Sequence, residues 1–181
     1  MSHDTIWMPA AELERLATAV FQGLGATEAD AAIAADVLIT ADRWGISSHG
    51  VNRLKPIYYD RIRAGTQSPV TKPEVVRDGP TTAVLDGRNG LGQVVAHRAM
   101  GMALDKARQY GLGMVAVRNS NHFGIAGYYA RMAADADMIG MVGTNARPSV
   151  APTFGVEPML GTNAMAFGMP SDEPFPFLLA C

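Results

Sequence analysis

The sequence is almost without cysteine. Its one cysteine among 181 residues is Cys181, so neither an intrachain disulfide nor a paired-cysteine zinc site can form. The net charge is -2, without the basic excess that marks most proteins that bind nucleic acids. No apolar run reaches the roughly 18 residues of a membrane-spanning helix, and no signal peptide is recognisable. We therefore expect a soluble, cytoplasmic protein that binds neither nucleic acid nor a membrane.

Several well-known functional loops are missing as well. The sequence contains no Walker A loop, no H-E-x-x-H, no G-x-S-x-G and no dinucleotide fingerprint G-x-G-x-x-G. Residues 86–92 carry the reverse spacing, G-x-x-G-x-G, between an expected strand and an expected helix. Backbone N–H groups in such a loop can cradle a phosphate, and the alternative is a tight turn. Both readings are open at this point.

Alternating helices and strands are the main structural pattern that is present. Helices are expected over residues 9–23, 28–42, 51–64, 91–110 and 127–137. Apolar runs predict strands over 81–86, 112–117, 138–144, 164–169 and 175–180, and the strand at 112–117 is expected to be buried. The sequence therefore predicts an α/β protein with a helical N-terminal domain, residues 1–68, and an α/β cofactor and substrate domain, residues 69–181.

Two of the four histidines lie in loops rich in Ser, Asn and Gly. These are His49 and His122; His3 and His97 receive no role. An imidazole titrates near neutral pH and can exchange a proton with a carbonyl or hydroxyl oxygen. Arg53 lies one helical turn after His49, where its guanidinium could bind the carboxylate of a substrate whose neighbouring oxygen contacts the histidine. The alternatives are hydrogen-bonded loop histidines and a solvated arginine.

Four segments together resemble the type 2 malate/L-lactate dehydrogenase family. They are Ser48-His49-Gly50-Val51-Asn52-Arg53-Leu54, Asp86-Gly87-Arg88-Asn89-Gly90-Leu91-Gly92-Gln93, Val117-Arg118-Asn119-Ser120-Asn121-His122-Phe123-Gly124 and Leu160-Gly161-Thr162-Asn163. They occur in the family's order and at similar spacing, and the resemblance covers essentially the whole chain. It implies a helical domain joined to a mixed, non-Rossmann cofactor-binding sheet domain. It also implies a homodimer that uses NAD or NADP to interconvert small 2-hydroxy and 2-keto acids, or to reduce a cyclic imino acid.

The resemblance also implies roles for individual residues. His49 maps onto the proton donor and His122 onto an acid/base candidate, while Arg53, with Ser48 and Asn121, would bind the substrate. The cofactor contacts map onto Asn145, Thr162, Asn163, Pro176, Phe177, Leu178, Leu179, Ala180 and Cys181. Some members of the family have Asp where Ala180 stands here.

Members of the family are nearly twice as long as this chain. Residues 175–181 also read as an apolar strand without a polar tail, so we expect the chain to be the N-terminal part of a longer protein. Two other functions stay open. One is an inactive or cofactor-free fragment that acts as an oligomerisation or ligand-holding module, and the other is a keto-acid isomerase or lyase that uses the same arginine and histidine side chains without a cofactor.

Overall fold

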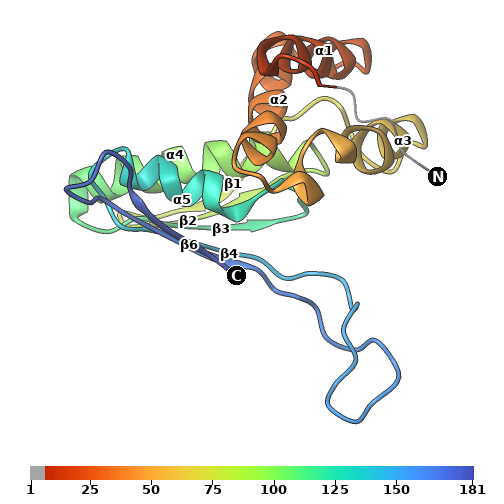
Figure 1. Ribbon diagram of the computed structural model, residues 1–181. Helices are drawn as coiled ribbons and strands as arrows, with labels where there is room; N and C mark the ends of the chain where they lie inside the picture. Colours follow the sequence, from red (N-terminus) through yellow and green to blue (C-terminus); the bar gives the residue numbers. More distant parts are fainter. Residues whose placement is uncertain (1–6) are drawn as a thin grey trace. The chain divides into compact units, whose positions relative to one another are not determined.

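The computed structural model describes residues 7–181, which divide into two compact units (Figure 1). Unit 1 is Met1–Ile125 and unit 2 is Ala126–Cys181. His3 lies outside the described residues. None of the described helices combines the length and the apolar character needed to cross a membrane. The division into domains at residues 1–68 and 69–181 stays a prediction.

Unit 1 begins with two helices that form most of the helical core. These are α1 (Ala10–Gly23) and α2 (Glu28–Arg43). Thr27 caps α2 as expected, because its side chain accepts a hydrogen bond from the backbone N–H of Asp30. Phe21, Leu38 and Tyr58 are fully buried where these helices meet the segment that follows them.

The helix expected over residues 51–64 is not a single α-helix. After a 3₁₀ turn at Ser47–His49, the segment contains a second 3₁₀ turn at Val51–Arg53, a π-helical turn at Leu54–Tyr59, and only one α-helical turn, α3 (Asp60–Arg63). Pro56 has no backbone N–H to donate, so a regular i to i-4 ladder cannot pass through it.

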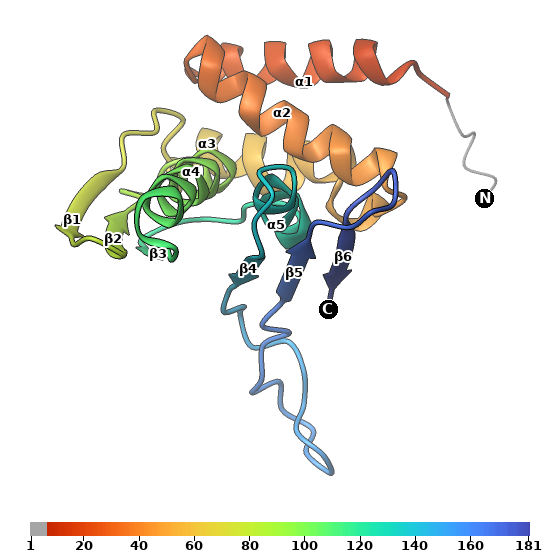
Figure 2. The same ribbon diagram turned by 90° about the vertical axis from the view of Figure 1, so that its left-hand side faces the viewer.

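The second layer of unit 1 is a small mixed sheet covered by one long helix (Figure 2). The strands are β1 (Glu74–Asp78), β2 (Thr82–Asp86) and β3 (Met114–Arg118), in the order β1-β2-β3. β1 and β2 are antiparallel, whereas β2 and β3 are parallel and joined through α4 (Gly92–Tyr110). Gly111 ends α4 with φ +79°, as its position predicted. The predicted α/β class with a mixed sheet is confirmed.

The strand expected at residues 112–117 is displaced by a residue or two and is not buried. β3 is an edge strand of its sheet, and Met114 and Val117 are 61% and 40% exposed. An apolar run fits both an edge strand with one open face and a strand covered on both faces. The burial prediction was therefore wrong although the strand itself was found.

Residues 86–92 form a tight turn instead of a phosphate cradle. Arg88 and Asn89 have φ of 47° and 59°, and the N–H of Gly90 donates to the Gly87 carbonyl, as in a type I′ turn. The N–H groups of residues 87–91 all donate to protein acceptors, which are Arg118 O, Asp86 Oδ1, Asn119 O, Gly87 O and Thr71 Oγ1. None of these N–H groups is left to bind an anion.

Unit 2 is a three-stranded antiparallel sheet with one helix packed against it. The elements are α5 (Ala126–Ala134), β4 (Gly140–Gly143), β5 (Met165–Met169) and β6 (Phe177–Ala180), and the strand order is β4-β5-β6. α5 lies close to the sheet because two strand positions have no side chain. A Cβ at Gly168 or Gly140 would lie 2.4 or 2.7 Å from the Ala130 carbonyl oxygen.

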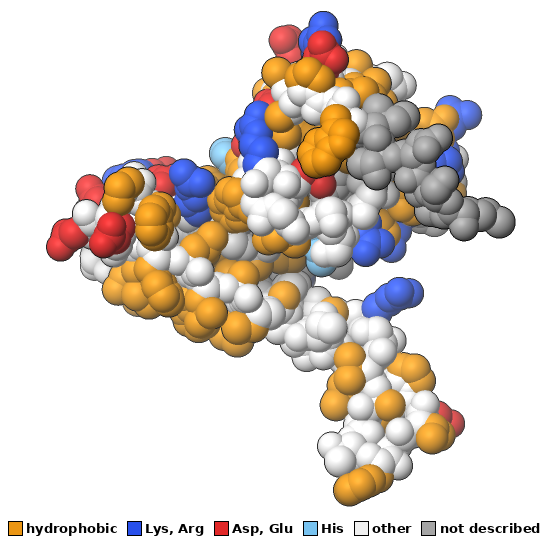
Figure 3. All heavy atoms as spheres, viewed as in Figure 1, with side chains coloured by type: hydrophobic (Ala, Val, Ile, Leu, Met, Phe, Trp, Pro, Cys, Tyr) orange, Lys and Arg blue, Asp and Glu red, His pale blue; other side chains and the backbone are white. Residues whose placement is uncertain are grey.

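Residues 144–164 connect β4 to β5 and extend away from the sheet as an apolar arm (Figure 1). The two sides of the arm meet at a bridge between Val150 and Leu160. Several apolar side chains are exposed on this arm (Figure 3), and Phe154 and Val156 are 104% and 93% exposed. Exposed apolar clusters of this kind commonly mark contact surfaces.

Replacing Gly92 by Ala should destabilise unit 1 because α4 begins against the backbone of residues 121–122. A Cβ at Gly92 would lie 2.3 Å from the Asn121 oxygen and 2.4 Å from the His122 oxygen. We expect Gly92→Ala to lower the free energy of unfolding by at least about 2 kcal/mol, measured by chemical denaturation.

Gly101→Ala is a matched control in the same helix. A Cβ at Gly101 would meet nothing within 4 Å, so this change should raise stability by about 0.5–1 kcal/mol. Equal effects of the two substitutions would contradict the close-approach argument.

Candidate active site

The two loop histidines of unit 1 lie face to face. The ring centroids of His49 and His122 are 5.6 Å apart, and the ring planes differ by 18°. His49 follows α2, whereas His122 lies between β3 and the end of unit 1. The structure thus brings together two imidazoles that lie in separate loops of the sequence.

The end of α2 positions the His49 loop. Gly45 has φ +74°, its N–H donates to the Asp42 carbonyl, and the N–H of Ile46 donates to the Ala41 carbonyl, which is a Schellman ending. The Asp42 carboxylate then accepts the N–H of Val51 at 2.8 Å. A Cβ at Gly50 would lie 1.8 Å from Asp42 Oδ1, so this contact requires glycine.

The turn at residues 86–92 positions the His122 loop. Asp86 accepts hydrogen bonds from Arg118 Nε at 2.9 Å and from Asn119 Nδ2 at 2.8 Å. Its pKa is lowered, first by the backbone N–H of Arg88 and then by the Asn119 and Arg118 side chains. Asn121 Nδ2 donates to Asn89 Oδ1 and to the Gly90 carbonyl, both at 2.9 Å. The Asn121 amide nitrogen thus ties the two loops together, and its substrate-binding role stays a prediction.

His122 is partly buried and makes two hydrogen bonds through one ring nitrogen. Its Nδ1 lies 2.6 Å from the Tyr58 hydroxyl and 3.3 Å from the backbone nitrogen of Gly124. Burial first, and then the charges of His49, Arg53 and Arg61 in that order, lower the pKa of His122 to about 4. His122 is therefore neutral at pH 7.

His49 is more open to solvent and is held at its Nδ1. The Ser48 hydroxyl lies 2.9 Å from His49 Nδ1, and Arg53 Nε donates to the Ser48 carbonyl. Partial burial, and then the charge of Arg53, lower the pKa of His49. Among residues 7–181, no carboxylate forms an ion pair with Arg53. An uncompensated guanidinium can bind a carboxylate, and an imidazole beside it can exchange a proton with an oxygen on the adjacent carbon.

The predicted cofactor residues all lie in unit 2. Asn145, Thr162 and Asn163 are at the base of the apolar arm and are exposed, and Asn163 Oδ1 accepts the N–H of Ala146 at 3.0 Å. The other predicted contacts form β6 and its flanks: Pro176, Phe177, Leu178, Leu179, Ala180 and Cys181. Their roles in cofactor binding stay predictions.

Tyr58 and Asp42 belong to the site but were not identified from the sequence. Tyr58 was assigned only to the apolar side of the expected 51–64 helix, although buried tyrosine hydroxyls usually have a polar partner. That rule would have shown that Tyr58 needed one. Asp42 ends a predicted helix, and nothing in the sequence marks it as the acceptor for Val51.

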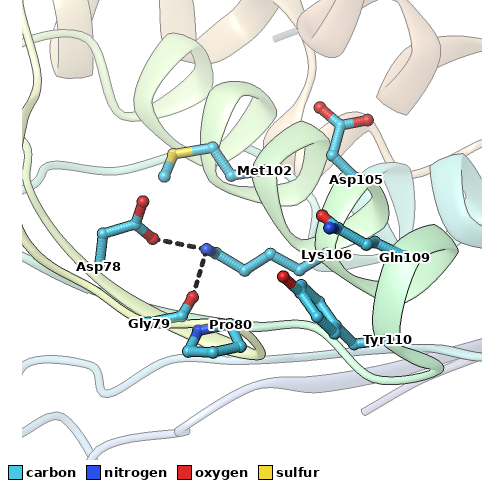
Figure 4. Close-up of a pocket in the computed structure, with 8 residues that line it drawn as sticks. All are labelled: Asp78, Gly79, Pro80, Met102, Asp105, Lys106, Gln109 and Tyr110. Atoms are coloured by element: carbon cyan, nitrogen blue, oxygen red, sulfur yellow. Dashed lines mark hydrogen bonds and ion pairs between the residues drawn. The ribbon is translucent and has the colours of Figure 1, made fainter.

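Apart from the histidine site, unit 1 has a hollow between the β1–β2 turn and α4 (Figure 4). The Lys106 ammonium reaches across it to the Asp78 carboxylate and, at 2.7 Å, to the Gly79 carbonyl. Its charge is therefore already compensated, and neither a histidine nor a cysteine lines the hollow. The lining residues are Asp78, Gly79, Pro80, Met102, Asp105, Lys106, Gln109 and Tyr110. Within residues 7–181, no group of three or more His, Cys, Asp and Glu side chains is arranged to hold a metal ion.

Known proteins resemble the chain over nearly its full length. A family model described as malate/L-lactate dehydrogenase matches residues 8–181. A malate dehydrogenase from Pyrococcus abyssi is 53% identical over 179 residues, which are 99% of this chain and 49% of that protein. An L-sulfolactate dehydrogenase from Methanocaldococcus jannaschii is 44% identical over 160 residues, which are 88% of this chain and 46% of that protein.

Solved structures give the same result. The crystal structure of malate dehydrogenase from Entamoeba histolytica matches with a TM-score of 0.95 at 48% identity, over 98% of this chain and 49% of that one. The chain therefore spans about half the length of the relatives that it matches.

The low pKa of His122 should make unfolding pH-dependent. Between pH 6.5 and pH 4 the unfolded chain binds a proton at this position and the folded chain does not, so stability falls as the pH falls. From pH 7 to pH 4 the wild-type chain should lose about 3 kcal/mol that His122→Gln does not lose. Denaturation of both proteins at each pH measures this difference, and identical pH dependence would show that His122 is not held neutral.

Proposed function

The chain belongs to the malate/L-lactate dehydrogenase family, and on that premise we propose that it transfers a hydride between NAD or NADP and a small 2-hydroxy or 2-keto acid. The observation that carries the proposal is the stacked histidine pair beside the uncompensated Arg53. A 2-keto acid has a carboxylate and a reactive carbonyl on adjacent carbons, which matches a guanidinium adjacent to an imidazole. Malate and lactate are the type of substrate expected.

Arg53 would bind and orient the substrate carboxylate. Its Nε is held by the Ser48 carbonyl, which leaves the terminal nitrogens to form paired hydrogen bonds with a carboxylate. The Ser48 hydroxyl is exposed, and in the proposal it donates to the same group. This contact would place the C2 oxygen of the substrate on the side of the histidines.

His49 would exchange the proton. Its Nδ1 is held by Ser48, so Nε2 is the free atom that faces substrate. The lowered pKa favours neutral His49 at pH 7, the form that accepts a proton from the hydroxyl in the oxidative direction. In the reductive direction the same atom gives the proton to the developing alkoxide. The nicotinamide supplies or accepts the hydride when it is bound.

The exposed edge of β6 has groups that fit a nicotinamide carboxamide. Met165 and Cys181 exchange two backbone hydrogen bonds, of 3.1 and 2.9 Å. Antiparallel alternation therefore turns the N–H and C=O groups of Leu178 and Ala180 away from β5. Within the described chain no strand pairs with that side of β6. Asn145, Thr162 and Asn163 add exposed polar groups in the same unit.

The alternative, a cofactor-free oligomerisation or ligand-holding module, is favoured by the apolar arm at residues 144–164. Phe154, Val156 and Met159 are among its exposed side chains, and surfaces of this kind are commonly covered in assemblies. A homodimer that covers the arm is compatible with the dehydrogenase proposal too. Nucleotide binding separates the two functions.

NADH and NADPH fluorescence titrations, followed by addition of pyruvate or oxaloacetate, test the proposal. We expect nucleotide binding and loss of NAD(P)H absorbance on addition of the keto acid. Turnover without nucleotide would contradict hydride transfer and support an isomerase or lyase. Absence of nucleotide binding by this chain, with binding restored in a longer chain, would support an inactive fragment of the dehydrogenase. Absence of binding in both chains would support the cofactor-free module.

Substitutions in the site should separate proton exchange by His49 from carboxylate binding by Arg53. His49→Asn should lower kcat/KM by about 10²–10⁴-fold through loss of proton transfer. Arg53→Lys keeps the positive charge but loses the paired N–H donors of the guanidinium, so it should raise KM by about tenfold. His97→Asn is the control, because His97 lies in α4 and has no role in the proposed site, and its kinetics should match those of the wild type. Equal activity of all three variants would contradict the residue assignments.

A further inference from the structure

The hydrogen bonds at His122 define its tautomer. The backbone N–H of Gly124 can only donate, so the Nδ1 atom that receives it carries no hydrogen. Tyr58 contacts the same nitrogen at 2.6 Å, so its hydroxyl must donate as well. In a neutral ring whose Nδ1 accepts, the hydrogen is on Nε2.

Tyr58 is fixed in the donor role by its surroundings. The side chain is fully buried, and its ring packs edge-on against Phe21 at 5.7 Å and against His122 at 5.7 Å. Burial raises the pKa of Tyr58 well above that of a free phenol, against the opposing charges of Arg61 and Arg53. The hydroxyl therefore keeps its hydrogen at any pH at which the protein works.

Fully buried Gln93 lies near the Tyr58 hydroxyl. It approaches Tyr58 closely enough to lower the pKa of that residue, although within residues 7–181 its amide atoms meet no partner at normal hydrogen-bond geometry.

The backbone of Gly124 is also fixed in position. It has φ +81°, and a Cβ there would lie 2.4 Å from Val37 Cγ1 in α2. A residue with a side chain is excluded by both the backbone conformation and the contact. The N–H that defines the His122 tautomer is thus fixed by the packing of unit 1.

The groups that face His122 all oppose a second proton on its ring. They are the stacked His49, the cations Arg53 and Arg61, the Tyr58 hydroxyl and the Gly124 N–H. No carboxylate is among the groups that shift its pKa. Protonation of Nδ1 would also break two hydrogen bonds and direct an N–H at an N–H.

We propose that Tyr58 is a positioning residue that holds His122 as the Nε2–H tautomer, so that His122 is a permanent hydrogen-bond donor to the substrate oxygen while His49 alone exchanges the proton. The part of the inference that concerns substrate rests on the proposed function. A fixed donor stabilises charge that develops on the oxygen without giving up its hydrogen. His122 would therefore polarise the carbonyl instead of acting as an acid or a base.

Nitrogen-15 NMR of the histidine rings tests the tautomer without substrate or nucleotide. In the wild-type protein we expect His122 to show an unprotonated Nδ1 and a protonated Nε2 from pH 5.5 to pH 8, with no titration. A protonated Nδ1, or titration within that range, would overturn the inference. Because the measurement needs no variant and no activity, it is independent of whether the proposed reaction is correct.

Tyr58→Phe tests the positioning role. Loss of the O–H donor should raise the pKa of His122, allow the second tautomer, and shift the acid limb of the kcat profile to higher pH. Tyr59→Phe is the matched control, because Tyr59 is 39% exposed and its hydroxyl has no contact with His122. Ring signals in folded Tyr58→Phe identical to those of the control would overturn the role of Tyr58.

Two substitutions of His122 test whether the residue acts as a hydrogen-bond donor or as a general acid. Gln has an amide N–H near the position of Nε2–H but cannot take up a proton, whereas Leu has no donor. We expect His122→Gln to retain kcat within about tenfold of the wild type, and His122→Leu to lose about 10²–10³-fold, as removal of an oxyanion donor does. If His122→Gln loses as much activity as His49→Asn in an otherwise active enzyme, the division of roles is wrong and the hydride-transfer proposal stands.

Discussion

The geometry of the site depends on the contact between the first turn of α4 and the backbone of residues 121–122. Gly92 allows this contact, because any side chain there would overlap two carbonyl oxygens. Asp86 secures it from the other side by binding Arg118 and Asn119. Together they place His122 against Tyr58 and opposite His49. The two stacked histidines are thus positioned by a turn and a helix start that have no proposed chemical role themselves.

The charges around the histidines fit an anionic substrate. Arg53 and Arg61 lower the pKa of His122, Arg53 lowers that of His49, and Arg53 has no acidic partner in the described chain. In the proposed reaction a substrate carboxylate at Arg53 compensates the charge that opposes protonation of both rings. Substrate binding then raises the pKa of His49 toward neutrality, which is the direction that proton exchange needs. His122 keeps its two donors at Nδ1, so the same change leaves it neutral.

Local sequence patterns predicted the regular helices and their caps. The turn, the irregular winding and the geometry of the site depend on contacts between residues that are distant in the sequence. The helix at 91–110 and the cap at Thr27 were found because helix periodicity and capping are local. The turn at 86–92 stayed ambiguous because its N–H groups are satisfied by residues such as Asn119 and Thr71. The irregular winding around Pro56 was missed because the apolar spacing there also fits an α-helix. Motif order suggested that His49 and His122 act together, but only the structure shows that their rings stack.

The stacking itself argues for different roles for the two histidines. Two imidazoles at a centroid distance of 5.6 Å repel each other when both are charged, so a proton on one disfavours a proton on the other. Burial and two donors at Nδ1 make His122 the neutral residue, whereas His49 is more exposed and is held only by Ser48. Reduction of a carbonyl needs one proton per turnover and a donor that stabilises the oxygen as hydride arrives. A pair of titratable groups in contrasting environments supplies both. Each ring is suited to its proposed role by the hydrogen bonds at its Nδ1 atom, which leave both Nε2 atoms available to the proposed substrate.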